Sequence, residues 1–255
     1  MSMHAVRRPV LAGNWKMHKG PADTSAFFDA FLRAHAPDPG RSVVFFPPAL
    51  SLAAAAAAVR DRTDVALGVQ NIHWETAGAF TGESSAPMAA QAGARFALAG
   101  HSERRHIFGE TDEQVGLKAA AALAAGLFPV ACVGETLAER ERGGLRDVLL
   151  RQVDAILDAV PADAGPALLV AYEPVWAIGT GVNATPADAT EAHAIIRDRL
   201  GSLYGEEAAA SIPILYGGSV KPDNAGDLLA ARGVDGLLVG GASLDPDGFA
   251  AICRS

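Results

Sequence analysis

The chain has 255 residues, of which 50% are hydrophobic and 20% are charged, and its formal net charge is −8 at pH 7. These proportions suffice for a packed core and exclude an intrinsically disordered chain. No apolar run reaches the roughly 18 residues that cross a bilayer, and the acidic charge disfavours nucleic acid and anionic membranes as partners.

The residues before the first predicted strand do not have the pattern of a secretory signal. The apolar run after Arg7 and Arg8 ends at Ala12, whereas a signal peptide needs an apolar segment of about 7 to 15 residues. We therefore expect a cytoplasmic protein. Cys132 and Cys253 are far apart and form no Cys-x-x-Cys motif, which predicts two reduced thiols rather than a disulfide framework or a metal site.

Short runs rich in Val, Ile, Leu and Phe recur along the chain, and each is followed by polar residues or glycine and then by a stretch of helical character. This spacing leaves room for the crossover helix that joins parallel neighbours in a sheet. The eight predicted strands are Val10 to Ala12, Val43 to Phe46, Val65 to Val69, Phe96 to Ala99, Phe128 to Val133, Leu168 to Tyr172, Ile212 to Tyr216 and Leu237 to Val239.

Two of the intervening helices are indicated by their residue types. Thr185 is typical of an N-cap, with Pro186 at the first helical position and Asp188 in the first turn, ahead of a periodic apolar stretch that runs to Leu203. The alanine run from Ala53 to Ala58 predicts an ordinary helix, because alanine is the best helix former.

Eight such units without a linker predict the fold class α/β, as a single closed (β/α)8 TIM barrel that covers residues 1–255. The alternative is an open, doubly wound sheet. Such a sheet is expected to carry a Gly-x-Gly-x-x-Gly turn after an early strand, and the sequence has no such turn. The barrel is therefore favoured, and its functional residues are expected just after the strands.

Two basic side chains that follow predicted strands are candidates for catalysis. Lys16 can hold a positive charge beside an anionic substrate, although a solvated surface lysine is the common alternative. His101 precedes the expected helix start at Ser102, and the positive end of a helix favours a neutral imidazole that donates a hydrogen bond. A structural histidine is the alternative. The spacing from His101 to His106 does not fit a zinc-binding helix, so we expect no metal.

Glu173 directly follows the sixth predicted strand and precedes Pro174, which predicts a carboxylate at the barrel mouth. It is the candidate general base, and a salt-bridged surface glutamate is the alternative. The next residues place three bulky apolar groups between a proline and two glycines, which predicts a lid over the pocket. The predicted lid comprises Pro174, Val175, Trp176, Ala177, Ile178, Gly179, Thr180 and Gly181.

Glycine pairs follow the last two predicted strands, as Gly217-Gly218-Ser219 and Gly240-Gly241. Glycine lets backbone N–H groups approach a tetrahedral anion, and the loops after strands seven and eight are where barrels bind phosphate. Either pair alone is compatible with a tight turn. Together they predict a phosphate site.

Together with their neighbours in the sequence, these residues make the chain resemble the triosephosphate isomerase family over essentially its whole length. The blocks that carry the resemblance are Asn14-Trp15-Lys16-Met17, Gly100-His101-Ser102-Glu103-Arg104-Arg105, the segment from Ala171 to Gly181, Tyr216-Gly217-Gly218-Ser219-Val220 and Val239-Gly240-Gly241-Ala242-Ser243.

The resemblance implies a step of glycolysis and gluconeogenesis, the interconversion of dihydroxyacetone phosphate and D-glyceraldehyde 3-phosphate through an enediolate, with no cofactor. The implied roles are Glu173 as base, His101 as neutral electrophile, Lys16 and Asn14 at the substrate oxygens, and backbone N–H groups of Gly179, Ser219, Gly240 and Gly241 at the phosphate. The resemblance also implies that Tyr216 and Ser219 latch the lid and that Glu103 supports the site.

The segment from Gln70 to Glu83 is longer than most loops and too apolar to remain in water, so we expect a partner to bury it. An internally packed loop is the alternative. The family resemblance implies a homodimer in which Thr81 approaches the active site of the neighbouring subunit. The residues expected in this dimer loop are Gln70, Asn71, Phe80, Thr81 and Gly82.

Two alternatives for the activity stay open at this point. One is an isomerase in the same superfamily that acts on a four-carbon phosphorylated ketose or aldose, and the other is a phosphate-ester binding barrel without catalysis. The chain also departs from the family after the lid, where Val182-Asn183 replaces a more usual polar pair. The effect of this change on lid motion is left open.

Overall fold

The computed structural model describes residues 6–178 and 184–255. Its parallel strands close into a barrel, because each strand pairs with the next and β1 also pairs with β8. This confirms the predicted TIM barrel. The strands are β1 (Val10–Asn14), β2 (Ser42–Phe46), β3 (Val65–Val69), β4 (Phe96–Ala99), β5 (Phe128–Val133), β6 (Leu169–Tyr172), β7 (Ile214–Tyr216) and β8 (Gly236–Val239).

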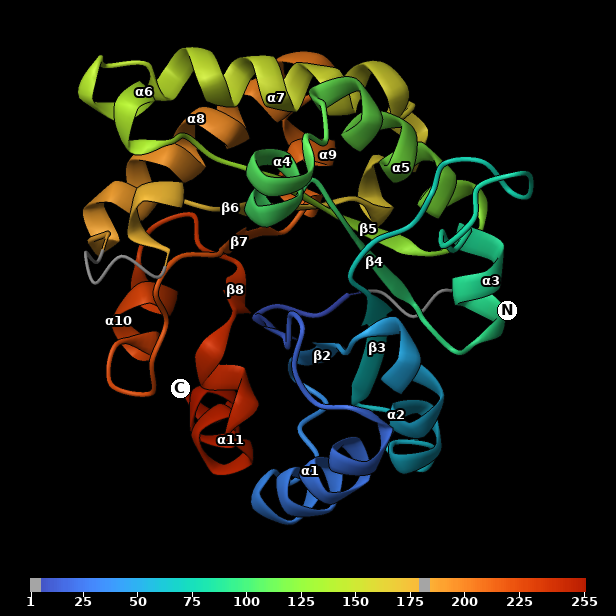
Figure 1. Cartoon of the computed structure of the whole chain (residues 1–255). Helices are drawn as coiled ribbons and strands as arrows, with labels where there is room; N and C mark the ends of the chain where they lie inside the picture. The colour runs from blue at the N-terminus through green and yellow to red at the C-terminus, as the bar shows by residue number, and fades with distance from the viewer. Residues whose placement is uncertain (1–5, 179–183) are drawn as a thin grey trace.

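Helices surround the strands as an outer ring (Figure 1). The α-helices are α1 (Pro21–Ala34), α2 (Leu52–Ala58), α3 (Ala86–Gln91), α4 (Ser102–Phe108), α5 (Asp112–Ala124), α6 (Leu137–Glu141), α7 (Leu145–Ala159), α8 (Pro186–Tyr204), α9 (Glu206–Ser211), α10 (Ala225–Ala230) and α11 (Pro246–Arg254). Short 3₁₀ helices are η1 (Ala49–Ser51), η2 (Ala162–Ala167), η3 (Val175–Ala177) and η4 (Gly241–Leu244). Within the described part of the chain, no helix is long and apolar enough to cross a membrane.

The core has two layers because successive side chains of a strand point to opposite faces. Val10 and Ala12 belong to the cluster that fills the barrel, whereas Leu11 between them packs outward beneath the helices. The outer layer includes an aromatic group in which Phe45 of β2 lies within 5.0 Å, centroid to centroid, of Phe28 from α1. Such aromatic pairs add to the stability that burial alone provides.

The strand runs were predicted well, with differences of one or two residues at the starts of β2, β6, β7 and β8 and at the end of β1. The seventh strand begins at Ile214, two residues later than expected, because Pro213 has no N–H to give to the sheet. The sixth begins at Leu169 rather than Leu168.

The predicted start of α8 is confirmed. The Thr185 hydroxyl accepts the Asp188 N–H at 3.2 Å, and the Asp188 carboxylate accepts the Thr185 N–H at 2.8 Å. This reciprocal capping fixes the chain just after the segment 179–183. The alanine run also forms the expected helix, α2.

Candidate active site

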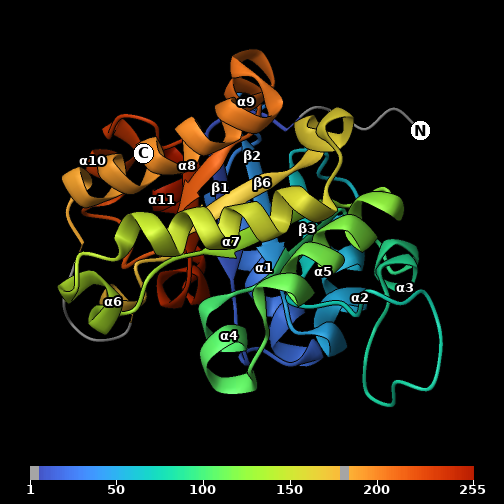
Figure 2. The ribbon, with the colours of Figure 1, turned by 90° about the horizontal axis from the view of Figure 1, so that it is seen from above.

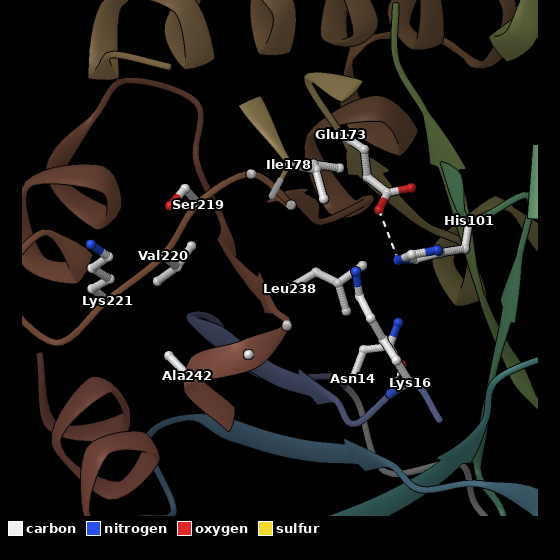
Figure 3. A pocket seen from close by; sticks show the side chains of 14 residues that line it. Asn14, Lys16, His101, Glu173, Ile178, Ser219, Val220, Lys221, Leu238 and Ala242 are labelled. Atoms are coloured by element: carbon white, nitrogen blue, oxygen red, sulfur yellow. Dashed lines mark hydrogen bonds and ion pairs between the residues drawn. The ribbon is translucent and has the colours of Figure 1, made fainter. Parts of the chain in front are cut away.

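A cavity of about 480 Å³ lies at the C-terminal mouth of the barrel. Parallel strands all end at this mouth, so side chains distant in sequence meet there. Figure 3 shows Glu173 and His101 close together on one side and Ser219 on the other. The lining residues are Asn14, Lys16, His101, Glu173, Ile178, Gly217, Gly218, Ser219, Val220, Lys221, Leu238, Gly240, Gly241 and Ala242.

Lys16 is held at the mouth by a constrained backbone. Trp15 before it is fully buried, which anchors the chain, and Lys16 itself has a φ of 51° in the left-handed region. Its N–H donates to Asn14 Oδ1 at 3.0 Å, and its carbonyl accepts from Gln70 Nε2 at 2.8 Å. Its ammonium lies 2.7 Å from a carboxylate oxygen of Glu103. Asn14 therefore helps to hold the Lys16 backbone, and Glu103 helps to hold its ammonium group.

His101 caps the N-terminus of α4, and its hydrogen bonds define its tautomer. The imidazole Nδ1 accepts the Glu103 N–H at 3.3 Å, and the nearer Glu103 carboxylate oxygen is 3.7 Å away, too far for a hydrogen bond. A nitrogen that accepts a hydrogen bond carries no proton, so this contact fits the tautomer whose hydrogen is on Nε2. That nitrogen lies 3.0 Å from Glu173 Oε1 and donates to it. The geometry therefore fits an imidazole acting as donor.

Glu173 is only 2% exposed, and its carboxylate is turned toward α4. Oε2 accepts the Ser102 N–H at 2.8 Å, and the Ser102 hydroxyl lies 3.4 Å from Oε1. The N-terminus of a helix stabilises negative charge, which compensates for the burial of the carboxylate.

The main chain at Glu173 packs closely against two glycines, where a side chain would not fit without a shift. A Cβ atom on Gly134, directly after β5, would lie 1.8 Å from the carbonyl oxygen of Glu173. A Cβ on Gly217 would lie 3.0 Å from the Glu173 Cγ. The main chain that carries the carboxylate is thus packed directly against neighbouring backbone.

The far side of the cavity consists of the glycine turns after β7 and β8. Gly240 packs beside Lys16, where an added Cβ would lie 3.5 Å from the lysine Cε. The Ser243 N–H and hydroxyl both donate to the Gly240 carbonyl, at 2.8 and 2.7 Å. Gly218 is confined by Tyr216, whose hydroxyl oxygen would be 2.2 Å from an added Cβ. At their glycines, these turns bring backbone without a side chain to the cavity.

The first residues of the predicted lid pack on their own chain. Val175, Trp176 and Ala177 form η3, and Ile178 lines the cavity. Trp176 Nε1 donates to Glu135 Oε1 at 2.7 Å. The predicted lid residues Gly179, Thr180 and Gly181, and the departure at Val182-Asn183, lie outside the described residues.

Glu135 is buried beneath η3, and its carboxylate accepts hydrogen bonds from several side chains. Its Oε1 accepts from the Tyr172 hydroxyl and from Arg140, each at 3.1 Å, and Arg140 also pairs with Asp188 of α8. Burial and the nearby Glu135 charge raise the pKa of Tyr172, so that phenol stays protonated. The expected latch residue Tyr216 is also buried, which raises its pKa to about 12. Its hydroxyl has no hydrogen-bond partner among the described residues.

The predicted dimer loop divides into two parts. Gln70 and Asn71 contact their own chain, since Gln70 Nε2 also donates to the Phe46 carbonyl at 2.8 Å and Lys118 donates to Asn71 Oδ1 at 2.7 Å. Phe80, Thr81 and Gly82 are exposed. The segment between β3 and α3 projects from the body of the molecule in the view of Figure 2.

Sequence reasoning missed three features of the site. Ser102 stood in a quoted motif, but its contact with Glu173 was not foreseen. Gln70 was assigned only to the dimer loop, although it holds the Lys16 carbonyl. Lys221 lines the cavity and was not predicted, although its place two residues after the glycine turn of β7 was the available indication.

Comparison with known proteins agrees with this geometry. The family model described as "Triosephosphate isomerase" matches residues 9–255. The triosephosphate isomerase of Solibacter usitatus is 49% identical over 247 residues, which cover 97% of this chain and 99% of the relative. That of Symbiobacterium thermophilum is 48% identical over 250 residues, 98% and 97% of the two chains. That of Chloroflexus aurantiacus is 48% identical over 247 residues, 97% and 98% of the two chains.

These matches extend over both the strands and the glycine turns that form the cavity. The chain therefore belongs to the triosephosphate isomerase family.

Proposed function

We propose that this enzyme interconverts dihydroxyacetone phosphate and D-glyceraldehyde 3-phosphate, with Glu173 as base and His101 and Lys16 as the groups that stabilise the enediolate. The observation that carries the proposal is the meeting of these three side chains with two glycine turns around one cavity. The substrate is inferred from family membership, and the contacts within the cavity support the roles proposed for the three side chains.

Substrate binding has to free Glu173 from its present contacts. The carboxylate is bonded to Ser102 and His101, so it must turn away from α4 to reach a carbon of the substrate. In the same step the Nε2–H of His101 loses its acceptor and becomes available to the substrate carbonyl. One rearrangement therefore prepares both the base and the electrophile.

The proton transfer then balances within the substrate. Glu173 takes a proton from C1 of dihydroxyacetone phosphate, the electron pair of that C–H bond forms the C1–C2 double bond, and the carbonyl oxygen takes the negative charge. The His101 donor, the Lys16 ammonium and the Asn14 amide stabilise this enediolate. After proton exchange between the two oxygens, Glu173 returns a proton to C2.

The remaining assignments concern phosphate and solvent. We assign phosphate binding to the backbone N–H groups of Gly179, Ser219, Gly240 and Gly241, and the lid to residues 174–181, with Tyr216 as its latch. The positions of Ser219, Gly240 and Ile178 around the cavity support this assignment. A covered site excludes water, which limits loss of phosphate from the enediolate.

A coupled assay with dihydroxyacetone phosphate tests the proposal, using the native chain, Glu173→Gln and the exposed control Glu207→Gln. An amide cannot accept the carbon-bound proton, so kcat should fall at least about 100-fold in Glu173→Gln and stay unchanged in the control. A Glu173→Gln enzyme within tenfold of native kcat would contradict the assigned base. Turnover of a tetrulose phosphate is measured alongside, and a preference for it would move the substrate to the four-carbon class.

We also propose a homodimer. Large apolar side chains are exposed on the segments that follow β1 to β4, including Met17 (94% exposed), Met88 and Phe108. A second cavity of about 190 Å³, lined by Lys16, Glu103 and Phe108 among others, opens beside the active site. This cavity offers a place for the projecting loop, with Thr81, of a second copy.

A further inference from the structure

The active-site cavity is lined by two cations, Lys16 and Lys221. They differ in whether their ammonium group already has an ion-pair partner. Lys16 has a carboxylate partner in Glu103 at 2.7 Å. In the described part of the chain, the ammonium of Lys221 has no hydrogen-bond or ion-pair partner. Glu173 adds a negative charge to the same cavity, and the whole chain carries −8. Lys221 is therefore the lining cation whose charge is not offset by a bonded neighbour.

Lys221 lies on the phosphate side of the cavity. Figure 3 shows it beside Ser219 and Val220, across the cavity from Glu173 and His101. It lies two residues after Ser219 of the glycine turn that follows β7, and we assign the Ser219 N–H to the phosphate. A positive charge at this end acts on the phosphate group rather than on the reacting carbons.

The backbone of Lys221 is fixed, which leaves its side chain as the contributing group. Asn224 Oδ1 accepts the Lys221 N–H at 2.8 Å, and Asn224 Nδ2 donates to the Ser219 carbonyl at 3.1 Å. The Asn224 N–H also donates to the Lys221 carbonyl at 3.2 Å. Since its N–H is occupied, Lys221 cannot join the backbone donors to phosphate. Its ammonium remains free on a flexible stem anchored beside them.

We propose that Lys221 is a substrate-binding residue whose ammonium attracts and binds the phosphate dianion of the substrate. This inference rests on the proposed function, because it takes the ligand to be a phosphorylated sugar. The backbone N–H groups provide directional hydrogen bonds, and Lys221 provides the full positive charge that such dipoles lack. Because the lysine is exposed, its effect is screened by salt.

The test compares Lys221→Met, Lys221→Arg and the control Arg232→Met. Methionine keeps the length of the stem without charge, arginine keeps the charge, and Arg232 is an exposed cation just before β8, at the opposite end of the barrel. The control removes the same net charge from the protein as Lys221→Met does. Steady-state kinetics are measured at ionic strengths of about 0.01 M and about 0.1 M, where the Debye length falls from about 30 Å to about 10 Å.

We expect Lys221→Met to raise KM about fivefold at the lower ionic strength, with kcat within twofold, and the increase to shrink at the higher one. Lys221→Arg and Arg232→Met should resemble the native enzyme. A KM for Lys221→Met that matches Arg232→Met, or a loss confined to kcat, would overturn the proposal.

Calorimetric titration with inorganic phosphate separates this inference from the proposed function, because it needs no turnover. Weaker phosphate binding by Lys221→Met than by Arg232→Met supports the role of Lys221 even for a chain that fails to isomerise the triose. Equal binding by the two variants counts against Lys221 whatever the assay of the native chain shows.

Discussion

Lys16 shows how a single strained residue can be useful at this site. A left-handed backbone costs a non-glycine residue roughly 1 to 2 kcal/mol. Hydrogen bonds from Gln70 and to Asn14 offset that cost and restrict the backbone to one conformation. In the role proposed for Lys16, the ammonium is then positioned before substrate arrives, so less reorganisation is needed when charge develops.

Gly134 is the residue at which a single methyl group should disturb Glu173, the proposed base. The Cβ of Gly134→Ala would lie 1.8 Å from the Glu173 carbonyl oxygen, so the end of β6 must shift. We expect a loss of stability of about 3 kcal/mol, the upper end of typical overpacking costs, and a lower kcat. Denaturant unfolding and the isomerase assay measure the two effects.

Gly20→Ala is the matched control, because no atom lies within 4 Å of the position of its added Cβ. It should keep native stability and kcat. If Gly134→Ala were as stable and active as Gly20→Ala, close packing of Gly134 against the Glu173 backbone would not be what positions the Glu173 carboxylate.

At the scale of elements, α8 is docked onto the barrel partly through His193. This residue is fully buried, and its Nδ1 donates to the Gly233 carbonyl at 2.9 Å, just before β8. Burial lowers the pKa of His193 to about 4 from a reference of 6.5. Between these pH values the unfolded chain binds the proton and the folded chain does not, so the free energy of unfolding falls as pH falls.

We therefore expect His193→Gln to weaken the acid sensitivity of the fold. The native chain should lose about 3 kcal/mol from this group between pH 7 and pH 4, and the variant should lack that loss. Denaturant unfolding at several pH values measures it, with the exposed His18→Gln as control. If the free energy of unfolding depended on pH in the same way for the native chain and for His193→Gln, another group would be responsible for the acid sensitivity.

The elements were largely predictable, and the contacts between them were not. The positions of Glu173 and His101 at the barrel mouth could be predicted because a barrel exposes the residues after its strands. The Ser102 contact with Glu173 depends on how the end of β6 faces α4, and the Gln70 contact with Lys16 joins segments after β3 and β1. Such contacts are set by barrel closure, which leaves no local pattern. Lys221 was missed because its place two residues after the glycine turn is the same in the sequence whether the side chain lines a cavity or is solvated.

At the scale of the whole molecule, the proposed dimer makes a direct prediction for Thr81. An arginine there would bring a long charged side chain into the proposed interface, where the cavity already holds the cations Lys16 and Arg104, which is unfavourable. Thr81→Arg should sediment as a monomer with at least about tenfold lower kcat, whereas the native chain is expected to sediment as a dimer. Leu203→Arg, at an apolar position that is 48% exposed on α8, serves as control and should stay dimeric. A native chain that is fully active as a monomer would refute the dimer.

The pairing of β1 with β8 also limits the ways in which copies of this chain can associate. A sheet that closes on itself presents no outer strand as a template for another polypeptide, so growth by strand addition would first require the barrel to open. Contacts between intact copies must then be made by side chains and connecting loops. The same closure that gathers the catalytic groups therefore also protects the folded enzyme against fibre-like polymerisation.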